Sequence, residues 1–341
     1  MARVVTFGEI MLRLSPVGSR RFEQSTTLEM FFGGSEANTA VALARWGHPV
    51  RYVTRLPRSW VGDACLAYLR GSGVDTSGIL REGDRLGIYF VELGRDVRPM
   101  RVLYDRAGSA FATLRPGEVP WSRHLSGAAW FHWTGITPAL TEATYHVTEE
   151  AVRAAAAAGA TISCDLNYRA ALWRWGLSPR EVMPALLQHA HVIITNGAGL
   201  ERMLGMETPT VPVPTTDAEA APWAQTAEAV ARRFPHVHTV AITLRDYRSA
   251  NDNVWSALLW HRGRTYRALV YHLTAIVDRV GAGDAFSAGL IHGLLTWPDA
   301  PARALAFATA AGALQHTVPG DALLADAEEV EALMRSLASR K

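Results

Sequence analysis

The chain of 341 residues almost lacks lysine, because its only lysine is Lys341, the last residue. A Walker-A nucleotide site needs a Gly-Lys-Ser/Thr sequence, and a protein kinase needs a strand lysine on the ATP phosphates. Neither is possible here. Schiff-base aldolases and pyridoxal-phosphate enzymes are excluded for the same reason. Any clamp on a phosphate or carboxylate must therefore be built from arginine and backbone amides.

Cysteines and long apolar runs are also scarce. Cys65 and Cys164 are the only cysteines and cannot form a disulfide framework. No apolar run reaches 18 residues, and a strand-like run at 4–8 leaves no room for a signal peptide. A net charge of +2 argues against nucleic acid as a partner. We therefore expect a cytoplasmic protein that binds neither nucleic acid nor membrane.

The order of apolar patterns predicts an α/β fold. Short β-rich runs alternate with longer helical patterns, which is typical of a mostly parallel sheet covered by helices on both sides. The predicted strands are 4–7, 50–54, 129–133, 161–166, 192–195 and 239–244. The predicted helices are 36–46, 61–71, 142–158, 179–189 and 218–234, followed by 281–295, 301–316 and 327–340.

Two segments interrupt this alternation. Residues 21–32 alternate in polarity, and 86–93 and 98–106 look like strands joined by a turn at 94–97. We interpret 13–33 and 86–114 as a small β lid inserted into an α/β domain made of 1–12, 34–85 and 115–341. A lid suits phosphoryl transfer because it excludes water from the site. Pairing of two copies through lid strands would give a homo-oligomer.

The sequence Asp278-Arg279-Val280-Gly281-Ala282-Gly283-Asp284 carries the clearest chemical signal. Small residues at 281–283 allow a tight turn, and the apolar run that follows predicts a helix beginning there. Free amides and the positive end of a helix dipole form an anion site, usually for phosphate. A carboxylate at such a site, Asp284, is repulsive unless it accepts a proton from an attacking hydroxyl. The loop therefore predicts phosphoryl transfer to an alcohol.

Together with Gly33-Gly34-Ser35-Glu36-Ala37-Asn38-Thr39-Ala40, this loop resembles the ribokinase-like (PfkB) carbohydrate kinases over essentially the whole chain. The resemblance implies a three-layer α/β/α domain with a β-sheet lid, and ATP with Mg2+ as cofactors. It implies that Asp284 is the general base and that the amides of Gly281, Ala282 and Gly283 form the anion hole.

Finer matches are similar to the 2-keto-3-deoxygluconate kinases, which would make the 6-phosphate of that sugar acid. They are Gly87–Phe90, Tyr104–Ser109 and Asp165–Arg169. An acidic sugar needs a cation, and Arg106 and Arg169 offer two-pronged donors. The implied sugar-binding residues are Gly33, Gly34, Asn38, Tyr89, Tyr104, Arg106, Asn167, Arg169 and Asp284. The implied nucleotide-binding residues are Asn196, Thr243, Arg245, Gly281 and Gly283, and Asp278 is the metal-site candidate.

The chain departs from the family pattern at two points near the nucleotide. Most members carry Asn-x-x-Glu after a late strand, but Gly199 stands where that Glu would follow Asn196, and Glu201 comes two positions later. Arg245 replaces a glycine of the adenine-side loop. The metal arrangement and the phosphoryl donor therefore stay open at the level of sequence.

Structural roles compete with several of these assignments. Asp284 could cap the helix that follows it, and Asp278 could simply end a strand. Gly33 and Gly34 could form a turn and nothing more, and Asn38 could bond the backbone near the start of the helix without contacting the substrate. The arginine and tyrosine candidates also have structural alternatives, namely ion pairs of Arg106 with Asp105 and of Arg169 with Asp165, and packing of Tyr89 and Tyr104 on the apolar face of the lid.

Two other functions remain open as well. One is a fructokinase or another ribokinase-like kinase of a neutral sugar. The other is a non-catalytic sugar-binding regulator, which the glycine at position 199 suggests.

Overall fold

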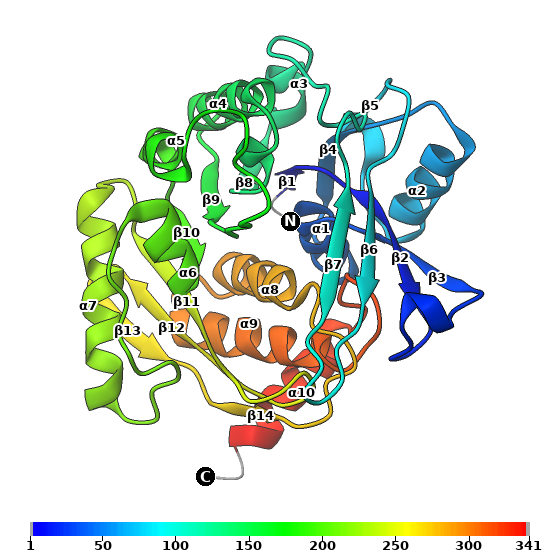
Figure 1. The fold of residues 1–341 in the computed structure, drawn as a ribbon. Helices are drawn as coiled ribbons and strands as arrows, with labels where there is room; N and C mark the ends of the chain where they lie inside the picture. The colour runs from blue at the N-terminus through cyan, green and yellow to red at the C-terminus, as the bar shows by residue number, and fades with distance from the viewer. Residues whose placement is uncertain (1–2, 339–341) are drawn as a thin grey trace.

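The computed structural model describes residues 3–338, which form a large α/β body and a smaller separate sheet (Figure 1). The strand order of the large sheet is β13-β12-β11-β10-β9-β8-β1-β4-β5, and β14 pairs with β12. These strands are β1 (Arg3–Phe7), β4 (Val50–Leu56), β5 (Ile79–Arg81), β8 (Ala128–Thr134), β9 (Thr161–Asp165), β10 (Val192–Thr195), β11 (Thr239–Tyr247), β12 (Asn253–His261), β13 (Arg264–Arg267) and β14 (Tyr271–Leu273).

The large sheet is mostly parallel, as the sequence predicted. All neighbouring pairs from β5 to β11 run parallel, whereas β12 pairs antiparallel with β11, β13 and β14. The six predicted strands are confirmed. The antiparallel extension was not predicted, and it places the turn at 248–252 between β11 and β12.

Helices cover both faces of this sheet, which confirms the three-layer arrangement. One core cluster lies under α1 (Ser35–Arg45), α2 (Trp60–Gly71), α8 (Ala282–Thr296), α9 (Pro301–Gln315) and α10 (Ala327–Ala338). The other lies under α3 (Trp121–Leu125), α4 (Glu142–Ala157), α5 (Pro179–Leu186) and α7 (Asp217–Arg233). The predicted helices are confirmed, although residues 339–340 of the last one lie outside the described residues.

The predicted lid forms the second sheet, with strand order β3-β2-β6-β7. Its strands are β2 (Met11–Pro16), β3 (Leu28–Gly33), β6 (Ile88–Glu92) and β7 (Arg101–Asp105). The β6–β7 hairpin is confirmed, while β2 was not predicted as a strand. The chain returns to the main core after β7, where Phe111 packs against Phe7.

Helix packing fixes the position of the predicted anion loop. A Cβ added at Gly289 or Gly293 of α8 would come within 2.7 or 2.5 Å of Ala308 or Ala304 of α9. The two helices can therefore pack closely against each other. This packing holds the N-terminus of α8 near the carboxyl ends of the parallel strands (Figure 1).

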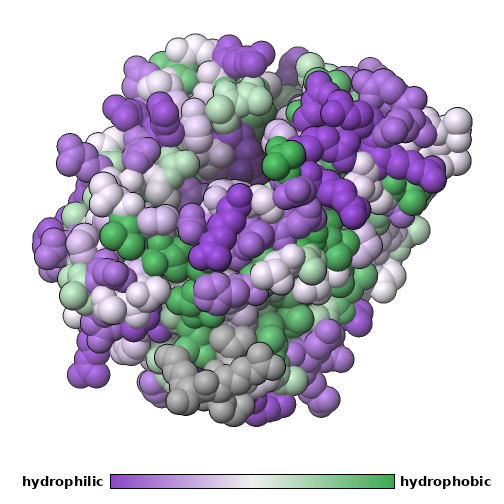
Figure 2. Space-filling model, turned by 60° about the horizontal axis from the view of Figure 1, so that its bottom comes forward, coloured by the Kyte–Doolittle hydropathy of each residue, from purple (hydrophilic) through white to green (hydrophobic). Residues whose placement is uncertain are grey.

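Hydrophilic and hydrophobic residues are interspersed over the face shown in Figure 2, and a recess opens in its upper half. None of the helices in the described part of the chain has the length and apolar character needed to cross a membrane.

Candidate active site

Asp284 lies in the first turn of α8, and its side chain points toward α1. Ser35 Oγ donates a 2.5 Å hydrogen bond to Asp284 Oδ1, and Asn38 Nδ2 donates a 2.7 Å bond to Oδ2. Asn167 Nδ2 donates to Ser35 Oγ at 2.9 Å, so the hydroxyl hydrogen of Ser35 is left to point at the carboxylate. The acid is thus held by neighbouring elements and does not cap its own helix.

The turn before Asp284 leaves helix amides free. Gly281 is the N-cap of α8 with φ +80°, and no side chain accepts from the first amides of the helix. An ideal Cβ at Gly281 would meet the carbonyl oxygen of Asp321 at 1.7 Å, so only glycine fits. Open amides at the positive end of a 15-residue helix make an anion site beside the carboxylate.

Three buried carboxyl groups, those of Asp284, Asp165 and Glu36, lie near the N-terminus of α8, and each has a raised pKa. Burial raises the pKa of Asp284, against the opposing effect of its bonds from Ser35 and Asn38. Burial, reinforced by repulsion from Asp284, raises the pKa of Asp165 to about 7. Burial raises the pKa of Glu36 to about 7, although Thr134 and Thr137 donate hydrogen bonds to it. A cation or a proton near these groups would relieve their mutual repulsion.

A cleft of about 740 Å³ opens between the lid and the large sheet, and it collects nearly all of the predicted site residues. Two of them do not line it: Ala282, whose side chain is buried in the core, and Asp278. The predicted residues that line the cleft are Gly33, Gly34, Asn38, Tyr89, Tyr104, Arg106, Asn167, Arg169, Asn196, Thr243, Arg245, Gly281, Gly283 and Asp284.

The two arginines proposed for an acidic sugar differ in their partners. Arg106 donates to Glu9, a buried residue that also accepts from Ser109. Arg169 lines the cleft and has no ion-pair partner within 4.0 Å among the described residues. Asp105 is bound by Arg85 and not by Arg106. Arg169 forms no ion pair with Asp165 within 4.0 Å, but its charge opposes the rise in the pKa of both Asp165 and Asp284. Arg169 is therefore a cation near two cleft carboxyl groups whose N–H groups are free of a direct ion pair among the described residues.

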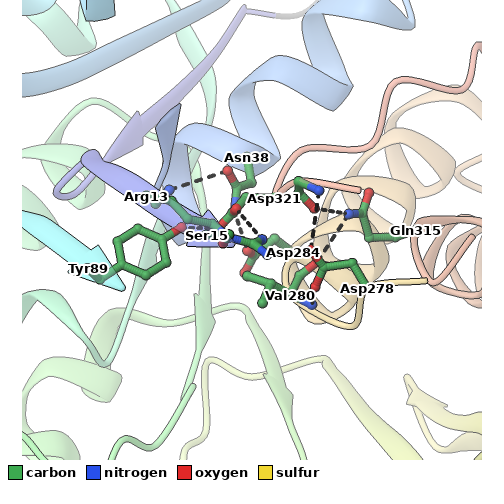
Figure 3. Close-up of polar contacts among 11 residues, drawn as sticks. Arg13, Ser15, Asn38, Tyr89, Asp278, Val280, Asp284, Gln315 and Asp321 are labelled. Atoms are coloured by element: carbon green, nitrogen blue, oxygen red, sulfur yellow. Dashed lines mark hydrogen bonds and ion pairs between the residues drawn. The ribbon is translucent and has the colours of Figure 1, made fainter. Parts of the chain in front are cut away.

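Tyr89 and Tyr104 stack on each other on the lid, with ring centroids 5.9 Å apart. The Tyr89 hydroxyl donates to Asp321, which lies between α9 and α10 and lines the cleft. Figure 3 shows Tyr89 and Arg13 reaching from lid strands toward Asp321. Tyr89 thus packs on the lid and also contacts a cleft carboxylate.

Asp278 is part of a buried network and does not itself line the cleft. Its Oδ2 accepts from Arg13 at 2.6 Å and from the Gly320 amide at 3.3 Å, and its Oδ1 accepts from the Val280 amide at 3.0 Å (Figure 3). Both oxygens are therefore committed to holding the loop, and this geometry gives the metal-site prediction for Asp278 no support.

At the far side of the cleft, Asn196 Oδ1 caps the short helix α6 (Gly197–Gly199) by accepting from the Gly199 amide at 2.9 Å. Glu201 accepts from Thr208 and does not line the cleft, so it does not replace the missing glutamate. A Cβ at Gly199 would meet Thr195 Oγ1 at 2.5 Å. The local packing thus explains why a side chain is absent at this position.

Comparison with known proteins identifies the family of this chain. The model of the pfkB family of carbohydrate kinases matches residues 1–327. The chain belongs to this family. A 2-dehydro-3-deoxygalactonokinase of Haloferax volcanii is 34% identical over 339 residues, which cover 98% of this chain and 97% of that protein. A 2-dehydro-3-deoxygluconokinase of Thermoproteus tenax is 28% identical over 341 residues, covering 99% and 95%.

One solved structure has a higher sequence identity to this chain than these two relatives. The crystal structure of 2-dehydro-3-deoxygluconokinase from Thermotoga maritima has a TM-score of 0.92 and 41% identity, covering 98% of this chain and 100% of that one. The protein is therefore a carbohydrate kinase, a phosphotransferase of a family that uses ATP. The resemblance found in the sequence is confirmed.

The cleft also contains polar and charged residues that the sequence analysis did not assign to a role. Local signals existed for most of them, since Ser35, Glu36 and Arg279 lie within the two quoted motifs and Asp165 lies near the end of a predicted strand. Glu9 and Asp321 come from segments without a recognisable pattern and reach the cleft only through tertiary packing.

Proposed function

We propose that this kinase transfers the γ-phosphoryl group of ATP to the 6-hydroxyl of 2-keto-3-deoxygluconate. The supporting observation is the position of Asp284, which Ser35 and Asn38 orient at the open amide end of α8. The same cleft contains the cation Arg169, which has no ion-pair partner within 4.0 Å among residues 3–338. A general base, an anion site and a carboxylate-binding cation then meet under one lid, as phosphorylation of a sugar acid requires.

In this mechanism Asp284 accepts the proton of the attacking hydroxyl as the sugar oxygen bonds to phosphorus. The two hydrogen bonds that its carboxylate accepts orient it and favour its ionised form. The amides of Gly281, Ala282 and Gly283 stabilise the charge on the transferring phosphoryl group. The lid keeps water away, which protects ATP from hydrolysis.

The acidic end of the sugar would lie against Arg169, with Tyr104 and Arg106 nearby on the lid side. Arg106 already donates to Glu9, so it offers only its remaining N–H groups. Arg169 has the larger unused capacity and should contribute most to discrimination in favour of a carboxylate.

Magnesium would be held mainly by the nucleotide. No group of three or more histidine, cysteine or acidic side chains suited to a metal ion occurs within residues 3–338. Mg2+ commonly binds through substrate phosphates, water and one or two carboxylates, and the buried acid Asp165 beside Asp284 fits such a role. When bound, the ion would neutralise phosphate charge.

The epimer 2-keto-3-deoxygalactonate is the second candidate, because a relative 34% identical over nearly the whole chain is named for that sugar. The two acids differ only in configuration at C4. Both would present the same carboxylate to Arg169 and the same terminal hydroxyl to Asp284, so the proposed roles of these two residues are the same for either acid.

An ADP-release assay with Mg2+ and ATP tests the proposal. The substrates are both keto-deoxy acids, fructose and ribose, each at millimolar concentration. We expect turnover with a keto-deoxy acid and little with the neutral sugars. Turnover of fructose alone would identify a neutral-sugar kinase, and sugar binding without any ADP release would identify a regulator.

A homo-oligomer formed through lid strands remains a proposal. The edge strands β3 and β7 carry exposed apolar residues, among them Met30 at 57% and Leu103 at 66% exposure. Burial of such residues against a second lid would be favourable.

A further inference from the structure

Two arginines lie close to one tyrosine ring in the cleft. Arg245, on β11, has its guanidinium carbon 5.3 Å from the centroid of the Tyr247 ring, and Arg279, just before the anion loop, lies 5.1 Å from the same centroid. Arg245 also lies 5.0 Å from the Trp255 ring. All four residues line the cleft.

Neither arginine has a carboxylate partner. No ion pair of Arg245 or Arg279 within 4.0 Å is present among residues 3–338, and their hydrogen bonds go to neutral groups. Arg245 donates to the Tyr247 hydroxyl at 2.7 Å, and Arg279 donates to the carbonyl oxygens of Ser249 and Ala250. Asp278, the acid nearest in sequence, is already bound by Arg13.

Two like charges held this close are unfavourable without an anion. Burial lowers the pKa of Arg279, and repulsion from Arg245 lowers it further, while Tyr247 and, to a smaller extent, the carboxylate of Asp278 oppose the change. The aromatic rings hold the guanidinium groups in place but do not neutralise them. A ligand with several negative charges would satisfy both groups at once.

The position of the pair indicates which anion this is. Arg279 is two residues from Gly281, whose loop provides the amides for the transferring phosphoryl group. Arg245 lies beside Thr243 on the predicted nucleotide side of the cleft. We propose that Arg245 and Arg279 together bind the phosphate groups of the nucleotide donor, and this proposal rests on the proposed kinase function. In a chain without a usable lysine, the pair supplies the positive charge that a lysine gives in other kinases.

The same pair would stabilise the departing diphosphate. When the sugar oxygen bonds to the γ-phosphorus and its proton passes to Asp284, the bond to the bridging oxygen breaks. The electron pair of that bond remains on the β-phosphate of ADP. Charge gained there is favourable next to two guanidinium groups, so their removal should lower turnover as well as affinity.

Calorimetric binding of ADP, inorganic tripolyphosphate and adenosine to the whole protein tests this inference. We expect Arg245→Met and Arg279→Met each to weaken ADP and tripolyphosphate binding at least about tenfold, with adenosine affinity nearly unchanged. Arg248→Met is the matched control, because Arg248 directly follows β11, does not line the cleft, is 53% exposed and pairs with Asp246 at 3.8 Å. It should leave all three affinities within about twofold.

The inference is overturned if the double variant R245M/R279M binds ADP and tripolyphosphate within twofold of the unchanged protein. If a Met variant does not fold, Arg245→Gln and Arg279→Gln allow the same measurement, and the same twofold limit applies to them. ADP release measured in parallel separates this inference from the kinase proposal. If ADP binding depends on the two arginines but no sugar is phosphorylated, only the proposed function is overturned. If sugar is phosphorylated equally well without Arg245 and Arg279, only the proposed role of these two arginines is overturned.

Discussion

Arg13 on lid strand β2 and Asp278 just before the anion loop form a 2.6 Å ion pair in which both side chains are almost fully buried. Arg13 also bonds Asp321 Oδ1 at 2.9 Å, and Tyr89 of the lid donates to the same carboxylate group. One guanidinium thus joins the lid, the approach to the anion loop and the α9–α10 connection. The proposed base Asp284 follows Asp278 by only six residues, so its position depends on this junction.

Replacing Arg13 should destabilise the fold strongly. Arg13→Met leaves Asp278 and Asp321 buried and uncompensated, and breaking a buried ion pair from one side costs about 3–5 kcal/mol. Urea unfolding would measure this loss of free energy. Arg153→Met removes an exposed pair with Glu149 and should change stability by less than about 1 kcal/mol. Equal effects of the two substitutions would contradict a structural role for the buried network.

Removing the proposed base should affect catalysis and leave the fold intact. Asp284→Asn keeps the size of the side chain and loses the proton acceptor, so turnover should fall by about two to four orders of magnitude. Steady-state ADP release, with the melting temperature as a check on folding, measures this. Since burial raises the pKa of Asp284, activity of the unchanged enzyme should decline on the acid side at a pH above the usual aspartate range. A variant with near-normal turnover would rule out the base assignment.

Arg169 should determine the preference for an acidic sugar. Arg169→Met removes a charge-assisted contact to the sugar carboxylate, so KM for the keto-deoxy acid should rise about 10- to 100-fold, with a smaller change for a neutral sugar. Arg174→Met is a suitable control, because Arg174 lies nearby in the chain and does not line the cleft. If KM rose equally for acidic and neutral sugars, Arg169 would not bind the sugar carboxylate.

The buried Glu36 should make stability depend on pH in a predictable direction. Its pKa is raised to about 7 in the folded protein by burial, whereas a glutamate in the unfolded chain titrates near about 4.3. The folded state therefore holds the proton more tightly, and this stabilising contribution is present below the unfolded pKa and lost as the pH rises through 7.

Glu36→Gln should accordingly flatten the fall in unfolding free energy between about pH 5 and pH 8, measured in urea at several pH values. Glu29→Gln changes an exposed carboxylate on β3 and should leave the profile unaltered. If the Glu36→Gln profile followed that of the unchanged protein, the carboxyl group would not be titrating in this range.

Restoring a glutamate at position 199 should not improve the enzyme. A side chain there would meet Thr195 Oγ1 and Leu166, so Gly199→Glu should cost about 1–3 kcal/mol of stability by overpacking. Thermal unfolding and Mg2+ titration of ADP release would measure both effects. If Gly199→Glu needed less Mg2+ for half-maximal ADP release and kept its stability, position 199 would accept the glutamate that other family members carry.

The strand and helix assignments in the main sheet could be predicted because each depends on a local apolar period. The antiparallel strands β12–β14 and lid strand β2 were missed. The signal for β12 was local, because this mostly buried strand pairs with β11 and β13 across short turns. The short strand β2, in contrast, pairs with β6, which lies far along the chain. Gly34, which the resemblance implies is a sugar-binding residue, also has a structural reason. Its Cβ would meet the Glu9 carbonyl oxygen at 2.0 Å, so the glycine is required by the adjoining backbone whether or not a sugar is bound.

The sequence by itself determined that a glycine turn leads into a helix with an acid in its first turn, because turn and helix propensities act over a few neighbouring residues. Only the tertiary structure decided which side chains meet that acid. Ser35 lies 249 positions from Asp284, and Arg13 lies 308 positions from Asp321. Contacts over such separations follow from how whole strands and helices pack together, which no local pattern of residues specifies.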